Sequence, residues 1–438
     1  MKLYIIQPSH YRSRKDRTIH KTQKRSVVNL TLPYLAALTP KHWDVKLIDE
    51  QLDEIDYDVP VDLVALSTWT INSLWAYEIA KRFRSKGIPV IMGGPHTFFY
   101  ADEAAQHCDA VGIGEGEEIW PTMLADAAAG RLKKFYRSEN YHDLRGLPLP
   151  RYDLINLKHY GFFTTYSVQT SRGCPFSCDF CSERFYLGQK YRYRPVDEVI
   201  EEIKRTGAKS VFFADSNLAG KRAHTMELME ALIPLKVRWS ALWSMDLCGN
   251  LEFMKLAKKS GLLHVNIGME SIDQETLDGM NKKANKASQY EKTLEILRKM
   301  GISYSVNLIF GHDSEKPSVF EATMEFLMRN KVPAAYFNIL TPHVGTPLYE
   351  RMESENRILD AYNMGRWTGL NCYIRPKNCS PEHLEAQVKQ LYQEFYSLSS
   401  MFSRLPWPIT KANIASWVVN FSQRKMALSD SMENFDNY

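Results

Sequence analysis

Three cysteines, Cys174, Cys178 and Cys181, lie within eight positions of the stretch SRGCPFSCDFCSER, and the chain supplies no fourth cysteine nearby. Structural zinc normally takes four protein ligands, and the next cysteine, Cys248, lies 67 positions beyond Cys181. A [4Fe–4S] cube has four irons, so three thiolates leave one iron open to a ligand that is not protein. The spacing therefore predicts an open iron–sulfur cluster, with an incomplete zinc site as the alternative.

The pattern Cys-x-x-x-Cys-x-aromatic-Cys, with Phe180 in the aromatic place, resembles the signature of the radical S-adenosylmethionine superfamily. The resemblance implies that the open iron chelates the amino and carboxylate groups of S-adenosylmethionine. One electron then cleaves this cofactor to methionine and a 5′-deoxyadenosyl radical, which abstracts hydrogen from a substrate. Cys174, Cys178 and Cys181 are thereby implied as catalytic cluster ligands, Phe180 as a cofactor contact, and a flavodoxin- or ferredoxin-type reductant as partner.

Two later stretches resemble cofactor-binding elements of the same superfamily. NIGMES, with Glu270 and Ser271, is similar to the fourth-strand motif whose glutamate helps to hold S-adenosylmethionine. FFADSN resembles the second-strand element and carries Asp215 and Asn217. An acid at the mouth of a barrel strand can equally cap a helix or pair with a lysine, and for Asp215 both interpretations stay open.

The elements that position these residues follow from the alternation of apolar runs and helical patterns. Within residues 1–140 the apolar runs are KLYIIQ, DVKLID, DLVALS, PVIMGG and DAVGIG. This rhythm is typical of an α/β, doubly wound, Rossmann-like sheet. Residues 141–165, punctuated by proline, are expected to form a linker.

A second alternating series covers residues 166–350 and begins at YSVQTS, directly before the cysteines. Its six strand–helix units fall short of the eight of a closed barrel. We therefore expect a partial, TIM-like (β/α)6 barrel with its active residues at the carboxyl ends of the strands. Residues 351–438 are helical and aromatic in pattern, and they predict a small C-terminal domain that could cover the substrate.

Three small-residue loops end successive strands of the first domain, and together they would form a crevice at one edge of its sheet. No Gly-x-Gly-x-x-Gly follows the first strand, which argues against nicotinamide or flavin. With the cysteine loop, the trio resembles cobalamin-binding radical S-adenosylmethionine proteins, which implies that the nucleotide tail of cobalamin enters the crevice. The implied contacts are Ser67, Thr68, Gly93, Gly94, Pro95, His96, Gly114, Glu115, Gly116 and Glu117.

The loop after the first strand, QPSHYRSR, lacks the Asp and Gly of the Asp-x-His-x-x-Gly pattern that supplies a histidine to cobalt. The resemblance thus implies cobalamin without a histidine lower ligand, and His10 is expected to be a loop residue. The stretch 12–25, with seven basic residues to one acid, is expected to be a solvated loop, with a flap over phosphate as the alternative. A degenerate domain that no longer binds cobalamin is also left open.

Composition bounds the remaining possibilities. The 438 residues carry 55 basic and 51 acidic side chains, a net charge of +4, which argues against nucleic acid as a partner. No run reaches membrane-spanning length. Seven cysteines, an odd number with one tight cluster, suit a reducing compartment, so a cytoplasmic protein is expected.

The combined resemblance implies a cobalamin-dependent radical S-adenosylmethionine enzyme that methylates an unactivated carbon of a small-molecule or lipid substrate. Polar methyl transfer fails at such a carbon because it offers no lone pair. Cyclisation, rearrangement or oxidation without methyl transfer is the first alternative. A non-catalytic iron–sulfur or zinc module that senses redox state is the second.

Overall fold

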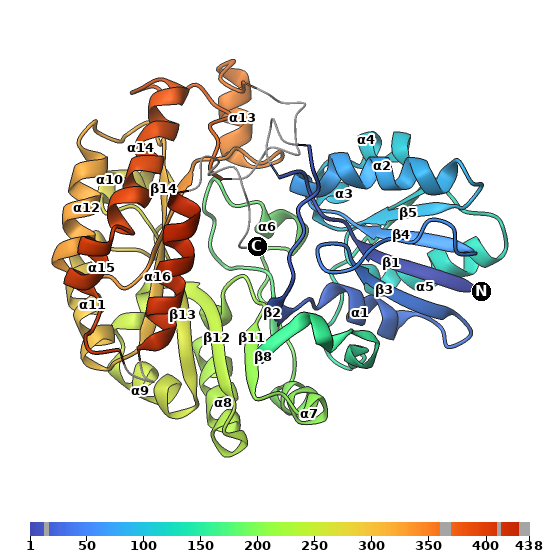
Figure 1. Cartoon of the computed structure of the whole chain (residues 1–438), viewed down its shortest axis with the longest axis horizontal. Coiled ribbons are helices and arrows are strands. Elements are labelled where there is room, and N and C mark those ends of the chain that lie inside the picture. Colours follow the sequence, from blue (N-terminus) through green and yellow to red (C-terminus); the bar gives the residue numbers. More distant parts are fainter. Residues whose placement is uncertain (13–16, 360–368, 410–412, 429–438) are drawn as a thin grey trace.

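The computed structural model describes residues 1–12, 17–359, 369–409 and 413–428, which form two α/β lobes side by side (Figure 1). The N-terminal lobe contains a six-stranded parallel sheet in the order β3-β1-β4-β5-β6-β7. Its strands are β1 (Lys2–Gln7), β3 (Asp44–Asp49), β4 (Leu63–Ser67), β5 (Val90–Gly93), β6 (Ala110–Ile113) and β7 (Phe135–Arg137). The doubly wound sheet expected from the sequence is confirmed.

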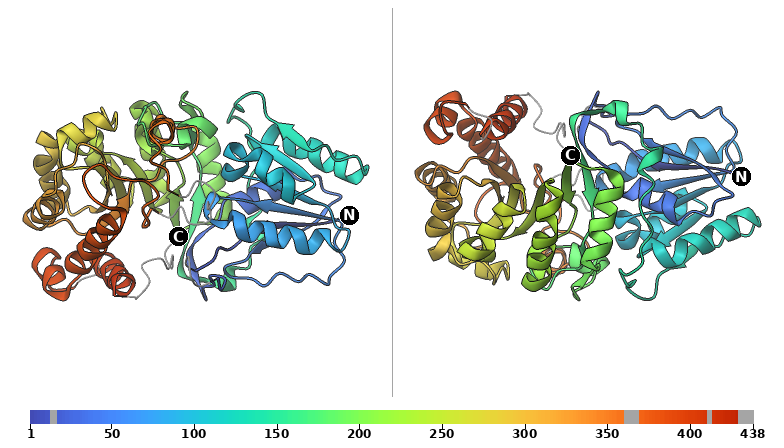
Figure 2. Two further views of the ribbon diagram at one scale, coloured as in Figure 1. Left: turned by 90° about the horizontal axis from the view of Figure 1, so that it is seen from above. Right: turned by 90° about the horizontal axis from the view of Figure 1, so that it is seen from below.

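Alternating side chains of the first strand enter two different cores, as a sheet covered on both faces requires. Leu3 and Ile5 pack in one apolar cluster, and Tyr4 and Ile6 pack in the other. The first cluster includes residues of α1 (Thr31–Leu38) and α5 (Gly116–Ala128). The second includes residues of α2 (Ser73–Arg84) and α4 (Ala101–His107), so helices cover both faces (Figure 2).

The second lobe is built on a seven-stranded sheet in the order β15-β14-β13-β12-β11-β8-β2, with parallel neighbours throughout. Six of its strands are those expected from the sequence: β8 (Tyr160–Val168), β11 (Ser210–Phe213), β12 (Arg238–Ser244), β13 (Leu262–Glu270), β14 (Ser303–Phe310) and β15 (Ala335–Ile339). The seventh, β2 (Arg25–Val28), comes from the N-terminal region and pairs with β8. The sheet is open, with β2 and β15 as its edge strands.

Helices cover the outer side of this sheet, and along the chain they lie between its successive strands (Figure 1). In the first of them, α7, the residues Val196, Val199, Ile200 and Ile203 recur at helical spacing and are buried. The helices are α7 (Val196–Thr206), α8 (Arg222–Leu232), α9 (Leu251–Lys259), α10 (Gln274–Gly279), α11 (Tyr290–Lys299) and α12 (Val319–Arg329).

The C-terminal helices extend the barrel wall. They are α13 (Pro347–Ser354), α14 (Pro381–Phe395), α15 (Leu398–Arg404) and α16 (Ile414–Ala427). The backbone amides of Ala335 and Phe337 in β15 donate hydrogen bonds of 3.1 and 3.0 Å to the hydroxyls of Tyr396 and Tyr392. Tyr392 and Tyr396 thus cover an edge strand whose backbone groups would otherwise lie open. Helices α13 and α14 share the apolar core of the barrel, whereas Met401 of α15 and Trp417 of α16 pack in a separate cluster.

Within the described residues, no helix has both the length and the apolar character needed to cross a bilayer.

Candidate functional site

The three cysteines lie on the loop between β9 (Ser171–Arg172) and α6 (Glu183–Tyr186). Gly173 opens this loop with φ of +85°, and a Cβ there would lie 2.5 Å from the carbonyl oxygen of Lys190, so only glycine fits. All three thiols are free; in addition to burial, Cys174 raises the pKa of Cys178, and Cys178 and Cys174 both raise the pKa of Cys181. Burial raises the pKa of the Cys181 thiol to about 12, and a bound metal ion would stabilise its thiolate.

The donor set fits an iron–sulfur cluster. Within the described ranges, no three His, Cys, Asp or Glu side chains converge closely enough to hold a single ion. Cysteine sulfurs that bind separate irons of one cube lie further apart than the ligands of one zinc ion. The loop supplies three cysteines and no fourth, which suits a cube with one open iron better than a four-ligand zinc site.

Glu270 ends β13 beside this loop, at a register shift in the pairing with β14 and with φ of +64°. Its buried carboxylate accepts a 2.8 Å hydrogen bond from the ammonium of Lys282, which is also buried. Burial alone would lower the pKa of Lys282, but the Glu270 carboxylate and the Cys178 and Cys181 thiols raise it. A buried zwitterionic pair thus lies against the cysteines.

Asp215 and Asn217 hold the backbone around the cysteine loop. The carboxylate of Asp215 accepts hydrogen bonds from the amides of Thr170 and Ser171, both at 2.8 Å, and from the hydroxyl of Thr170 at 2.7 Å. Burial raises the pKa of Asp215 to about 6. Asn217 caps the short helix that follows it by accepting from the amide of Ala219. Neither side chain lines the cavity described next.

A cavity of about 670 Å³ opens at the carboxyl ends of β12 to β15. The cysteine loop contributes Phe180, Cys181 and Ser182 to its lining, and β13 contributes Glu270. Its opposite wall includes Gln423 and Met426, which belong to α16. The C-terminal region therefore does contribute to the barrel mouth. Its remaining lining residues include Asn266, Asn307, Tyr336, Asn338, Leu340, Thr341, His343 and Tyr392.

A second cavity, of about 260 Å³, is the crevice at the edge of the N-terminal sheet. It is lined by eight of the ten residues expected there: Ser67, Gly93, Gly94, Pro95, Gly114, Glu115, Gly116 and Glu117. Gly94 has φ of +108°, and a Cβ on it would lie 2.6 Å from the carbonyl oxygen of Thr68. Gln169, Arg172, Tyr186 and Leu187 of the second lobe close the crevice.

The other two expected contacts, Thr68 and His96, lie behind the crevice. The hydroxyl of Thr68 donates to the carbonyl of Gly93 at 2.8 Å. His96 is fully buried, and its Nε2 lies 2.7 Å from the hydroxyl of Tyr77 on α2. Burial lowers the pKa of His96 to about 3, so the ring is neutral. Both residues support the loop from within the sheet's own core.

Two buried ion pairs join the lobes at the crevice. Arg192 donates to both carboxylate oxygens of Glu115, at 2.6 and 2.9 Å. Arg172, directly before the cysteine loop, donates to Glu117 at 2.6 Å, and the hydroxyl of Tyr34 donates to the same carboxylate at 2.7 Å. Burial opposes ionisation of Glu117, yet the Arg172 guanidinium lowers its pKa below the ordinary value. These carboxylates are therefore occupied by arginines.

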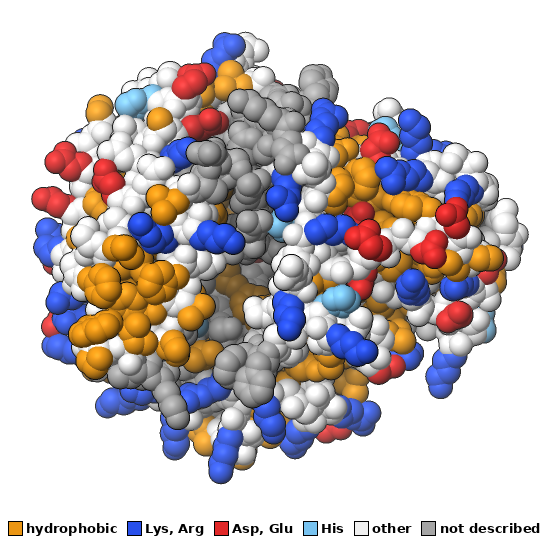
Figure 3. Space-filling view, viewed as in Figure 1, with side chains coloured by type: hydrophobic (Ala, Val, Ile, Leu, Met, Phe, Trp, Pro, Cys, Tyr) orange, Lys and Arg blue, Asp and Glu red, His pale blue; other side chains and the backbone are white. Residues whose placement is uncertain are grey.

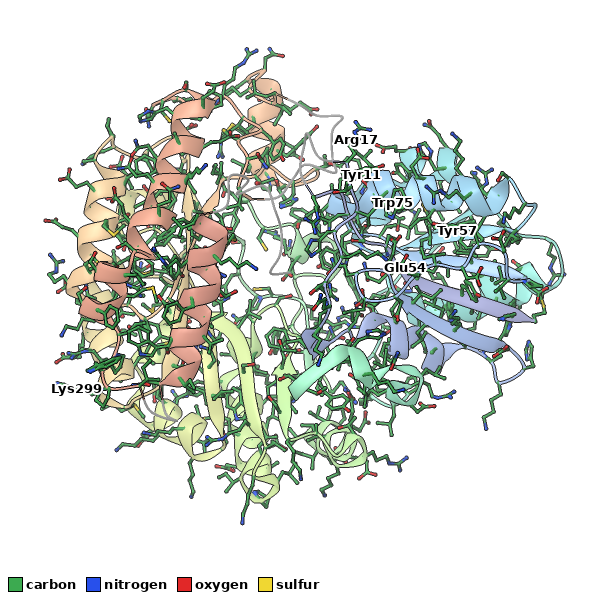
Figure 4. The ribbon with its side chains drawn as sticks, viewed as in Figure 1. Tyr11, Arg17, Glu54, Tyr57, Trp75 and Lys299 are labelled. Atoms are coloured by element: carbon green, nitrogen blue, oxygen red, sulfur yellow. The ribbon has the colours of Figure 1, made fainter. Side chains whose placement is uncertain are left out.

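The loop after β1 is packed against the protein. His10 is buried, stacks on His20 with ring centres 5.1 Å apart, and does not line the crevice. Burial lowers the pKa of His10 to about 4. In the basic stretch 12–25, residues 13–16 lie outside the described residues, but Arg17 covers the ring of Tyr11 (Figure 4). Further along, Lys21 and Arg25 form ion pairs with Glu54 and Asp49 of the N-terminal lobe, and Arg25 begins β2.

Two functional residues were missed by the sequence reasoning. Lys282 lies twelve positions after Glu270, across α10, and the motif that marks Glu270 ends before it. Arg172 precedes the first cysteine but meets its partner, Glu117, 55 positions away in the chain. A buried lysine or arginine near a site glutamate is a signal that only the folded chain provides.

Comparisons with known proteins agree with this geometry. The model of the radical SAM superfamily matches residues 168–327, and that of the B12 binding domain matches residues 21–124. The chain is 32% identical over 411 residues to bacteriochlorophyllide d C-12(1)-methyltransferase of Chlorobaculum tepidum, covering 91% of this chain and 89% of that protein. It is 28% identical over 400 residues to the C-8(2)-methyltransferase of the same organism, covering 87% and 88%.

Among solved structures, the radical S-adenosylmethionine methyltransferase TsrM of Kitasatospora setae, with cobalamin and a [4Fe–4S] cluster bound, aligns with a TM-score of 0.66. The alignment covers 88% of this chain and 84% of that one at 17% identity, and so supports the fold. With the relative of 32% identity over nearly the whole chain, these findings show that the protein belongs to the cobalamin-dependent radical S-adenosylmethionine methyltransferases, enzymes whose cofactors are a [4Fe–4S] cluster, S-adenosylmethionine and cobalamin.

Proposed function

We propose that this protein methylates an unactivated carbon of a bacteriochlorophyllide-like substrate. One observation carries the proposal: a single segment, residues 172–187, which contains the cysteine loop, borders both cavities. Residues 180–182 line the barrel cavity, while Arg172, Tyr186 and Leu187 line the crevice of the N-terminal sheet. Groups bound in the two cavities would therefore meet at one segment, as radical formation and methyl transfer at one substrate carbon require.

Each cofactor has residues suited to hold it. Cys174, Cys178 and Cys181 would bind three irons of the cluster. The Glu270 carboxylate and the Lys282 ammonium match the opposite charges of the amino acid part of S-adenosylmethionine. The crevice, with backbone exposed at Gly93 and Gly94, would take the cobalamin tail. Together the bound cofactors supply a hydrogen-abstracting radical and a methyl group; the protein supplies their placement.

The lining of the barrel cavity indicates an uncharged substrate portion. Among the described lining residues, Glu270 is the only acid, no lysine or arginine is present, and burial lowers the pKa of His343 to about 4. The Oδ1 atom of Asn266 and the Oε1 atom of Gln423 are buried without a hydrogen-bond partner. Such walls suit an apolar ring system with hydrogen-bonding groups at its edge and disfavour a phosphate or a nucleotide.

An electron must come from outside, because no redox group besides the cluster and cobalamin is expected. We assign this role to a flavodoxin- or ferredoxin-type protein in a reducing compartment. Seven free cysteines agree with such a compartment.

The test uses anaerobically reconstituted protein with cobalamin, S-adenosylmethionine, reduced flavodoxin and bacteriochlorophyllide d. We expect 5′-deoxyadenosine, S-adenosylhomocysteine and methylated pigment in equal amounts, because one S-adenosylmethionine yields the radical and another remethylates cobalt. 5′-Deoxyadenosine with altered pigment but without S-adenosylhomocysteine would indicate cyclisation, rearrangement or oxidation. Zinc in place of iron, with no cleavage of S-adenosylmethionine, would indicate a non-catalytic module.

A further inference from the structure

The outer surface of the C-terminal helices carries a concentration of exposed apolar side chains, seen as the orange area over α15 and α16 in Figure 3. Eight of the eighteen large apolar residues that are exposed in the described chain fall between residues 398 and 428. We call them the C-terminal patch: Leu398, Phe402, Trp407, Ile409, Ile414, Val418, Phe421 and Leu428. Exposed apolar residues elsewhere are mostly scattered singly and need no partner.

The patch is large for a face that stays in water. Trp407 is 67% exposed and Val418 is 62% exposed. Applied to side chains of roughly 150–250 Å², the exposed fractions of the eight residues sum to about 800 Å², which is the area that one partner contributes to a stable interface. A monomer in solution rarely leaves an apolar patch of this size uncovered.

The spacing on α16 indicates what covers the patch. Ile414, Val418 and Phe421 on α16 and Leu428, directly after its end, are exposed, and their spacings of four, three and seven match the heptad seam that packs against another helix. The position that completes the repeat is Lys425. A helix lying in a lipid surface instead shows a broad apolar face bordered by many basic residues. On the described part of α16 the basic residues are Arg424, which is half-buried, and Lys425, which is exposed.

We propose that a second copy of this chain covers the C-terminal patch, with α16 of each copy packed antiparallel about a two-fold axis between Val418 and Phe421. A seam that is apolar at its centre complements itself in this arrangement. The antiparallel orientation keeps the two Lys425 side chains about 16 Å apart along the axis at 1.5 Å per residue. A parallel pair would bring these like charges together.

The dimer has a consequence for the barrel cavity. The face of α16 that points away from the patch carries Gln423 and Met426, which line the cavity. A second copy packed on the outer face would therefore hold this wall of the cavity in place. The proposal rests on the exposed face alone and holds whatever the substrate is.

The experiment is sedimentation equilibrium of the reconstituted holoenzyme at micromolar concentration. We expect twice the 50.6 kDa of one chain. Val418→Glu places like charges on both sides of the axis and should yield monomers, as should Phe421→Glu. The matched control is Leu251→Glu, at an exposed apolar residue outside the patch that is 51% exposed, and it should remain dimeric.

A mixing step separates a lost interface from a lost fold. Val418→Glu and Val418→Lys should each be monomeric alone, and equal amounts of the two should form dimers again. A monomeric wild-type protein would overturn the proposal, as would dimers that survive both glutamate substitutions. Co-sedimentation of wild-type protein with phosphatidylglycerol vesicles, lost in Val418→Glu, would also overturn it in favour of a lipid surface.

Discussion

The cysteine loop and the crevice of the N-terminal sheet lie at the same kind of place, the carboxyl ends of parallel strands, yet they are built in opposite ways. The cysteine loop works through reactive atoms: three thiols, with the Glu270 and Lys282 pair beside them. The crevice depends on the absence of side-chain atoms, because Gly94 and its neighbours let a ligand approach the backbone closely. Substitutions in the cysteine loop should therefore act through the chemical type of the atom that is replaced. Substitutions in the crevice should act through the volume that is added.

The largest effect is expected from Cys178→Ala. Two thiolates cannot hold the cube in its open form, so iron content should fall and 5′-deoxyadenosine formation should drop below detection. Iron analysis and product quantification measure both. Cys379→Ala, a free and partly buried thiol outside the loop, is the control and should retain activity. Cleavage of S-adenosylmethionine by the Cys178 variant would contradict the ligand assignment.

Gly94→Ala tests the opposite principle, since it adds one methyl group and removes nothing. The new Cβ would lie 2.6 Å from the carbonyl oxygen of Thr68, and the positive φ adds about 1–3 kcal/mol of strain. Retained cobalamin, read from the visible spectrum, should fall at least tenfold, while 5′-deoxyadenosine is still formed.

The control for backbone strain without a steric clash is Gly87→Ala. Gly87 also has a positive φ, of +76°, but a Cβ there meets nothing within 4 Å. Equal loss of cobalamin in the two variants would mean that backbone strain, and not the shape of the crevice, is decisive.

Glu117→Gln tests the joint between the two regions. The amide keeps a hydrogen bond to Arg172 but loses the negative charge. Loss of one charge from a buried ion pair lowers the free energy of unfolding by about 3 kcal/mol. If this pair positions the cysteine loop against the crevice, 5′-deoxyadenosine formed per methylated product should rise several-fold. Glu201→Gln, which breaks an exposed pair with Arg205, should leave the ratio unchanged. A lower melting temperature with an unchanged ratio of 5′-deoxyadenosine to methylated product would mean that the Arg172–Glu117 pair only stabilises the fold.

The same contrast explains what the sequence could predict. The cysteine loop is local, because its ligands lie within eight positions and their types are diagnostic. The strand order also follows from local alternation. The strand β2, which joins the N-terminal region to the second sheet, could not be predicted in this way. It has only four residues, and its pairing with β8 depends on contacts between distant parts of the chain. Glu115 and Glu117 line the crevice where they were expected, but their arginine partners lie far along the chain and could not be read from the sequence.

The crevice glycines show an intermediate case. Small residues after three strands correctly indicated where a ligand could approach, and Gly94 is held by sterics that the structure displays. His96, two positions later, has the type of a ligand-binding residue but points into the core toward Tyr77. The residue types at a strand end therefore indicate where in the chain a ligand site lies, but they do not indicate which way each side chain points.

The smallest effect is expected from Asp215→Asn, which tests whether this residue contacts the cofactor. Three hydrogen bonds from Thr170 and Ser171 show it holding the entry to the cysteine loop. Asparagine can accept the two amide bonds, so KM for S-adenosylmethionine should change less than twofold. A tenfold rise would instead place Asp215 in contact with the cofactor.

Asp215→Asn should also change the pH dependence of stability. Burial raises the pKa of Asp215 to about 6, so between about pH 4 and 6 the folded protein holds a proton that the unfolded chain releases. The folded state then loses stability as pH rises through this window, by up to about 3 kcal/mol. The asparagine variant lacks this loss, so its melting temperature should fall less than that of wild type from pH 4 to 6. Parallel melting curves would mean that Asp215 stays ionised throughout, held by its three donors, and that its hydrogen bonds outweigh its burial.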